Sequence, residues 1–138
     1  MEKFSEGYHE IIVQKKETDF DQPTLTQNAR TLIYKIKGPL AYINAQAHIA
    51  RLECLPSHYT DIIIDLGDAH FIDLDGIEAF GEIVHILSAK NIEAYIVNLN
   101  PIVHHLLQES RSFQTLVKHH KIFPHVNQAL VAIAQEKN

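Results

Sequence analysis

Three consecutive isoleucines, Ile62-Ile63-Ile64, constrain the fold of this chain more than any other feature. Asp61 and Asp65 flank them, and the run itself shows no alternation between apolar and polar residues. A strand with one face in water alternates, whereas a strand in the middle of a parallel sheet is covered on both faces and is apolar throughout. The run therefore predicts a central strand, covered on both sides, in a sheet of the α/β class.

Strand-like and helix-like segments alternate along the rest of the chain. β-branched and aromatic residues predict further strands at 32–36 and 93–97 and a short edge strand at Ile11-Ile12-Val13. Apolar residues recurring every three or four positions predict helices at 43–54, at 76–90, from 101 and, starting at Ile122-Phe123-Pro124, through 133. Strands separated by helix-length segments are parallel neighbours joined by right-handed crossovers. We therefore expect an α/β fold with a mixed, mostly parallel central sheet and about four to five helices packed on it.

The length of 138 residues, 46% of them hydrophobic, suits one compact core and is short for two ordinary domains. We expect residues 1–28 to form an N-terminal edge strand and linker, and residues 29–138 to form the folded domain. The N-terminal segment is either a junction to a membrane domain, which we favour, or the natural start of a free-standing protein. The net charge of −5 argues against a nucleic-acid partner, because such domains usually carry clustered Lys and Arg. No stretch approaches the ~18–20 apolar residues that cross a bilayer, so we expect no direct membrane insertion of this segment.

Cysteine and histidine usage argues against a metal centre or another cofactor. The single cysteine, Cys54, excludes an internal disulfide and paired thiolate ligands, and we expect it to be a small buried apolar side chain near a helix end. His104-His105 and His119-His120 are adjacent pairs, and neighbours on a helix point about 100° apart, so neither pair chelates from one face. We expect the histidines to lie at the surface or to be partly buried, with His48 among the polar residues of helix 43–54.

Asp73-Leu74-Asp75-Gly76 carries the strongest functional signal, because it lies where a strand ends and a helix begins. Asp73 can cap the helix, Asp75 adds a second carboxylate near the positive end of the helix dipole, and Gly76 permits close backbone approach. Asn100-Pro101 starts the next helix with a capping side chain and a proline at the first helical position. From spacing alone, a well-capped helix explains these residues.

Several segments, taken in their order along the chain, resemble a known family. They are the strand 61–66, the loop 71–77, Leu99-Asn100-Pro101, the upstream segments 34–40 and 42–45, and Ile122-Phe123-Pro124. Together they resemble the STAS domain, which is shared by anti-sigma-factor antagonists and the cytoplasmic tails of SulP anion transporters. The upstream segments are similar to SulP tails in particular, and the resemblance covers about residues 32–134, nearly the whole domain.

The resemblance implies a domain that binds and regulates and is not an enzyme. Its interaction loop would be Asp73, Leu74, Asp75, Gly76 and Ile77, followed by the helix that ends at Lys90. Its partner would be the transmembrane domain of the same transporter, a cytosolic regulatory protein or a second STAS domain in a homodimer. The expected location is the cytoplasmic face of the inner or plasma membrane, and the transported species would be sulfate, bicarbonate or a related anion.

One position separates the two branches of the family. In anti-sigma-factor antagonists the residue just before the glycine of this loop is a serine or threonine that a partner kinase phosphorylates. Asp75 occupies that phosphosite-equivalent position here. A carboxylate accepts no phosphate from a serine kinase and already places negative charge at the helix start. The sequence therefore favours a transporter domain, with a free-standing anti-sigma-factor antagonist as the alternative.

Asp73-Leu74-Asp75-Gly76 also mimics the first motif of haloacid-dehalogenase-type phosphatases, in which two aspartates act as nucleophile and acid/base with magnesium. The threonine expected after that motif's glycine is Ile77 here. After residue 100 the only acidic residues are Glu109 and Glu136, so a complete magnesium site is hard to assemble. A fragment of such a phosphatase is the least favoured alternative.

Overall fold

A computed structural model describes residues 8–13 and 30–137 of the chain. A five-stranded sheet, in the order β1-β2-β3-β4-β5, forms its centre. The strands are β1 (Tyr8–Val13), β2 (Thr31–Lys37), β3 (Asp61–Asp68), β4 (Glu93–Val97) and β5 (Ile122–Phe123). The helices are α2 (Tyr42–Glu53), α3 (Leu74–Ala89), α4 (Pro101–Leu107), α5 (Arg111–Lys118) and α6 (Val126–Lys137). The expected α/β class is confirmed.

All four pairings between the described strands are parallel. The expected mixed sheet differs from this arrangement at its N-terminal edge, where β1 also runs parallel to β2, with Tyr8 opposite Thr31. Parallel neighbours require a connection of about a dozen residues or more. Residues 14–30 separate the two strands, so the chain is long enough between them for parallel pairing.

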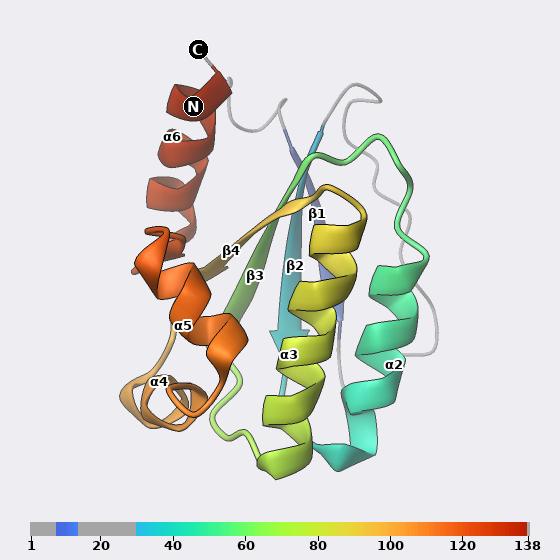
Figure 1. Cartoon of the computed structure of the whole chain (residues 1–138), viewed down its shortest axis with the longest axis vertical. Helices are drawn as coiled ribbons and strands as arrows, with labels where there is room; N and C mark the ends of the chain where they lie inside the picture. Colours follow the sequence, from blue (N-terminus) through green and yellow to red (C-terminus); the bar gives the residue numbers. More distant parts are fainter. Residues whose placement is uncertain (1–7, 14–29, 138) are drawn as a thin grey trace.

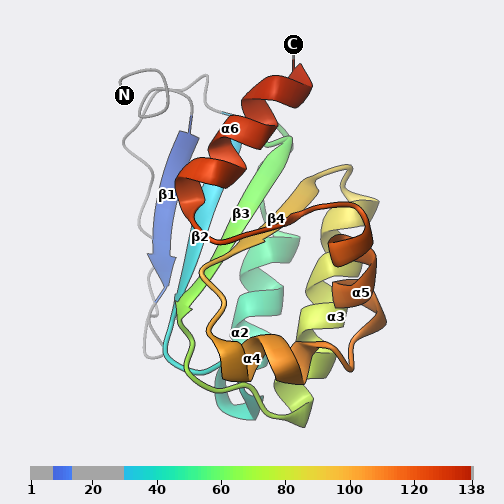
Figure 2. The same ribbon diagram turned by 90° about the vertical axis from the view of Figure 1, so that its left-hand side faces the viewer.

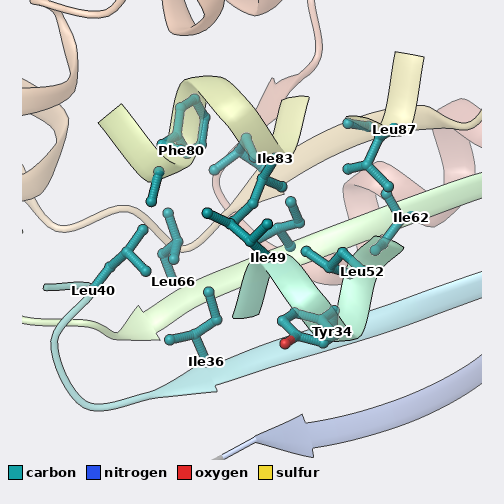
Figure 3. Close-up of a cluster of buried hydrophobic side chains, with 14 of the residues drawn as sticks. Tyr34, Ile36, Leu40, Ile49, Leu52, Ile62, Leu66, Phe80, Ile83 and Leu87 are labelled. Carbon is teal, nitrogen blue, oxygen red and sulfur yellow. The ribbon is translucent and has the colours of Figure 1, made fainter. Parts of the chain in front are cut away.

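Helices lie on both faces of the sheet, as the isoleucine run predicts. Helices α2, α3 and α5 cover one face, and α6 crosses the other (Figures 1 and 2). Ile62 and Ile64 belong to the larger apolar cluster beneath α2 and α3, whereas Ile63 belongs to the cluster beneath α6. Figure 3 shows the larger cluster, in which Tyr34 and Ile36 of β2 face side chains of both helices. Strand β3 therefore contributes side chains to the apolar cores on both faces of the sheet. Burying each of its aliphatic side chains stabilises the fold by about 1.5–3 kcal/mol.

The C-terminal third differs from the expected pattern in two elements. Ile122 and Phe123 pair with Ile96 and Val97 as a fifth strand, and the last helix begins only at Val126. Helix α5 was not expected at all. It begins after Ser110, whose hydroxyl accepts a hydrogen bond from the Phe113 amide at 3.2 Å. Its eight residues are fewer than the roughly 11–18 over which a helical period is recognised in a sequence.

Two single-residue expectations on α2 are wrong. Cys54 is exposed, because it is the C-cap residue at which the chain leaves the helix and it points away from the core that buries Leu52 and Leu55 on either side of it. His48 is buried in the core, and its Nδ1 lies 2.8 Å from the Tyr34 hydroxyl. Burial, reinforced by the charge of Arg51, lowers the pKa of His48 to about 4. A tyrosine on the neighbouring strand supplies the hydrogen bond that allows a histidine inside.

Candidate functional site

Asp73 joins the starts of two helices. Its Oδ1 accepts a hydrogen bond from the Gly76 amide at 2.7 Å, and its Oδ2 accepts one from the Tyr42 amide at 3.2 Å. The first contact is the expected N-cap of α3. The second serves α2, whose own N-cap residue, Ala41, has no polar side chain. One carboxylate therefore satisfies free N–H groups of both helices.

Gly76 is required by the close approach of α3 to the loop before α2. A Cβ atom at this position would lie 2.1 Å from the Leu40 carbonyl oxygen and 2.8 Å from Ile72 Cγ1. The Leu40 amide is itself bound to the Phe71 carbonyl at 3.1 Å, so the backbone on the other side of the contact is held in place. Close backbone approach, the role expected for Gly76, is thus a packing requirement.

Further side chains fix the loops around Asp73. Asn44 accepts a hydrogen bond from the Ala41 amide at 2.9 Å and donates one to the Pro39 carbonyl at 2.7 Å. Asn100 caps α4 through the Val103 amide at 2.9 Å, and its Nδ2 donates to the Ala69 carbonyl at 2.9 Å. The starts of α2, α3 and α4 are therefore tied to one connecting segment, residues 69–73.

The five residues expected in the interaction loop differ in how far their side chains are exposed. Gly76 is buried, and Asp73 and Ile77 are half-buried, with Ile77 packed against the core. Leu74 and Asp75 are exposed. Asp75 lies in the first turn of α3, where its charge is favourably placed toward the helix dipole. Only Leu74 and Asp75 of this group are placed to contact another molecule without rearrangement.

Exposed apolar side chains gather at the same end of the sheet. Seven large apolar side chains are exposed among the described residues, and five of them, with exposed fractions of 52–84%, lie at the helix starts or in the loop before α3. They are Tyr42, Ile43, Phe71, Leu74 and Ile102. Both ribbon views show the starts of α2, α3 and α4 at the end of the sheet to which the strand arrows point (Figures 1 and 2). We call these five residues together with Asp75 the docking face.

Most of the docking face was not expected from the sequence. Tyr42, Ile43, Phe71 and Ile102 are apolar, and an apolar residue in an amphipathic pattern is ordinarily assigned to the core. All four precede the buried part of their element, at or just before the first helical turn, so they project past the end of the sheet. Their position before the first buried residue of each helix is the signal that could have identified them.

The geometry offers little support for metal-assisted chemistry at Asp73 and Asp75. Both oxygens of Asp73 accept backbone hydrogen bonds, so its carboxylate already serves to hold the starts of α2 and α3. Within residues 8–13 and 30–137, the carboxylates, histidines and cysteine form no group of three placed to hold an ion. In the same ranges, every helix is too short or too polar to cross a membrane.

Residues 22–129 match the family model of the STAS domain. The chain belongs to the STAS domain family. The resemblance expected from the sequence is confirmed by this match, which includes the whole docking face. No curated protein sequence matches the chain.

Solved STAS structures have the same fold. The SulP transporter STAS domain from Vibrio cholerae is 21% identical, with a TM-score of 0.66 over 83% of this chain and 88% of that chain. The murine Solute Carrier 26 family member A9 anion transporter, in its inward-facing state, is 21% identical, with a TM-score of 0.67 over 96% of this chain and 23% of the transporter. The anti-sigma factor antagonist SpoIIAA in its unphosphorylated form is 14% identical, with a TM-score of 0.57 over 83% of this chain and 96% of the antagonist. At these identities the likeness concerns the fold.

Proposed function

We propose that this STAS domain is a cytoplasmic regulatory domain of a SulP-type anion transporter and that it acts by protein–protein contact through the docking face. The observation that carries the proposal is the concentration of exposed apolar side chains at the helix starts. Large apolar side chains exposed together at one end of a domain are typical of interaction sites. Burial of one such side chain contributes about 1.5–3 kcal/mol, so several together can offset the entropy lost on association.

The docking face is held in place before any partner arrives. Asp73, Asn44 and Asn100 fix its loops by hydrogen bonds to backbone groups, and Gly76 allows the helix starts to touch. A surface that is already ordered loses less conformational entropy on binding. Rigidity therefore supports a role in recognition at this end of the domain.

Asp75 favours the transporter over the antagonist. A phosphorylation switch needs a hydroxyl at this exposed position, and the carboxylate of Asp75 cannot serve. In this proposal the anion, sulfate, bicarbonate or a relative, is handled by a membrane domain, and the STAS domain modulates that domain by contact.

The alternative is a free-standing anti-sigma-factor antagonist. It is favoured by one observation, the coverage of SpoIIAA over 96% of its length. In that role the same docking face would meet an anti-sigma kinase, and the kinase would have to accept an aspartate at position 75.

Photocrosslinking in the cells that express the protein tests both functions. Benzoylphenylalanine placed at Leu74 should form an adduct, and mass spectrometry should identify it as a polytopic membrane protein or the membrane domain of the same polypeptide. An adduct with a kinase would support the antagonist instead. The same probe at Val131, which is exposed on α6 on the opposite face of the sheet, is the matched control. Equal adducts at both positions, or none at Leu74, would show that the docking role is wrong.

A further inference from the structure

We propose that the docking face recognises a basic, apolar segment of its partner, in which Lys or Arg side chains lie beside aliphatic or aromatic ones. This inference rests on the proposed docking function and adds to it the chemistry of the partner. It is carried by the distribution of charge around the apolar residues.

Acidic side chains continue the docking face along α3. Asp75, Glu78 and Glu82 are all exposed and are spaced by three and then four residues. This spacing places them on successive turns along one side of the helix. The side chain that begins the row, Asp75, directly follows Leu74, so the acidic row starts within the apolar surface.

Cationic side chains are scarce on the same elements, and Arg51, in the last turn of α2, is the single Lys or Arg within α2, α3 and α4. Residues 38–50, 69–89 and 91–110 contain no Lys or Arg, and these ranges include all of the docking face and nearly all of α2, α3 and α4. The nearest lysine along the chain, Lys37, lies 2.8 Å from Asp68 in an ion pair. Lys35 lies 3.8 Å from the same carboxylate, so Lys35, Lys37 and Asp68 together carry a net charge of +1. His70, His104 and His105 are exposed in the described segments beside the docking face.

The positive dipole ends at the helix starts favour anions, so their contribution to the local electrostatic potential opposes that of the carboxylates. Each helix N-terminus is equivalent to about +0.5 charge, which makes about +1.5 for α2, α3 and α4 together. Asp73, Asp75, Glu78 and Glu82 supply four negative charges, against the helix starts and the net +1 of Lys35, Lys37 and Asp68. The carboxylates prevail, and the field at the docking face attracts cations and repels phosphorylated or acidic partners.

The two kinds of side chain have different tasks in this recognition. Apolar contacts are not screened by salt and provide most of the affinity. Exposed charge pairs are screened by salt and mainly select the partner and speed association. Binding should therefore persist at high salt but become weaker and less selective.

Two synthetic peptides test the chemistry directly. Both are amphipathic helices with the same leucine pattern, and one carries Lys where the other carries Glu. The lysine peptide should shift the amide resonances of Tyr42, Ile43, Leu74 and Asp75 in the ¹⁵N-labelled full chain, and the glutamate peptide should not. The affinity for the lysine peptide should fall by about threefold to tenfold in Asp75→Asn/Glu78→Gln.

A matched variant controls for net charge. Glu53→Gln/Glu93→Gln changes the charge equally but at the opposite end of the sheet, so it should alter the affinity by less than about twofold. Retained amide spectra of both variants will establish that each is folded. An equal loss in both variants, equal binding of the glutamate peptide, or no shift with either peptide would overturn the inference.

Failure of this inference can be told from failure of the docking function. If the Leu74 crosslinker captures a partner segment that is acidic or lacks Lys and Arg, docking stands and the basic partner is wrong. If no adduct forms at Leu74, the docking function itself fails. Vesicles of phosphatidylserine that produce the same amide shifts would assign the face to a lipid surface and overturn the protein partner.

Discussion

The two ends of the sheet differ in whether the side chains at their surface have partners within the domain. At the amino end, Lys121 lies between two glutamates, 3.3 Å from Glu93 and 3.5 Å from Glu136. Its ammonium also lies 4.6 Å from the centre of the Tyr95 ring, and the Tyr95 hydroxyl donates to Glu136 at 2.9 Å. At the carboxyl end, Asp73 and Asn100 are hydrogen-bonded within the domain, whereas the apolar side chains of the docking face are exposed. We call the amino end the closed end, because its charged side chains pair with one another. The apolar side chains at the carboxyl end would be buried only by contact with a second molecule.

Gly76→Ala should have the largest effect on the carboxyl end. The new methyl group meets the Leu40 carbonyl, so we expect a loss of about 3 kcal/mol in the free energy of unfolding, measured with urea. Gly81→Ala is the matched control in the same helix, because the nearest atom to its Cβ is Ser112 Oγ at 3.6 Å. It should stabilise the protein by about 0.5–1 kcal/mol. Equal effects of the two substitutions would contradict the close approach.

Acidification should weaken the anchoring of α2, the helix that carries two residues of the docking face. The pKa of His48 is about 4 in the folded protein, below its ordinary value of 6.5. The unfolded chain therefore binds a proton first as the pH falls, and stability is lost progressively from pH 6.5 down to 4. The full loss is on the order of 3 kcal/mol. In His48→Gln this part of the pH dependence of urea unfolding should disappear, and an unchanged slope would show that His48 is not its source.

Removing apolar groups from the docking face should weaken partner binding without unfolding the domain. For Ile43→Gln/Leu74→Gln we expect a loss of about 2–3 kcal/mol in binding free energy, measured by titration with the partner captured at Leu74. The unfolding free energy should change by less than about 0.5 kcal/mol, because both side chains are exposed. Val131→Gln, on α6, is the control and should bind normally.

Lys121→Met should lower stability and leave partner binding unchanged, because Lys121 lies at the closed end of the sheet. We expect a loss of about 1 kcal/mol in stability, since Lys121 is largely buried but its two glutamate partners are more than half exposed. Partner binding should be unchanged. Lys118→Met, at an exposed position on α5, is the control for the loss of one charge. A binding defect in Lys121→Met would mean that the two ends are not independent.

Asp75→Ser should have the smallest effect on stability and still change binding. Loss of one exposed carboxylate near the start of α3 should cost about 0.5 kcal/mol or less. The affinity for the partner should fall by about threefold, the effect of one exposed charge. Calorimetric titration against the unaltered protein will measure it, and a variant that unfolds or binds normally would contradict the role of this position.

The elements that the sequence predicts well are those that local chemistry determines. Ile62-Ile63-Ile64 is a buried strand because β-branched residues favour strands and a sheet covered on both faces buries successive side chains. Asp73 caps a helix because its side chain reaches the amide three residues further on. Position in the assembled fold decides the rest. His48 is inside because Tyr34 lies opposite it, and Cys54 is outside because the helix ends there. The docking face combines three separate segments, 42–43, 71–75 and residue 102, which no single periodicity reveals.

The shared carboxylate of Asp73 has a mechanical consequence. A partner that draws Leu74 outward would also disturb the hydrogen bond that holds the first turn of α2. The two helices follow neighbouring strands and pack on one face, so neither start is displaced alone. A partner that binds at the loop before α3 would therefore displace the starts of α2 and α3 together, because both are hydrogen-bonded to the same carboxylate.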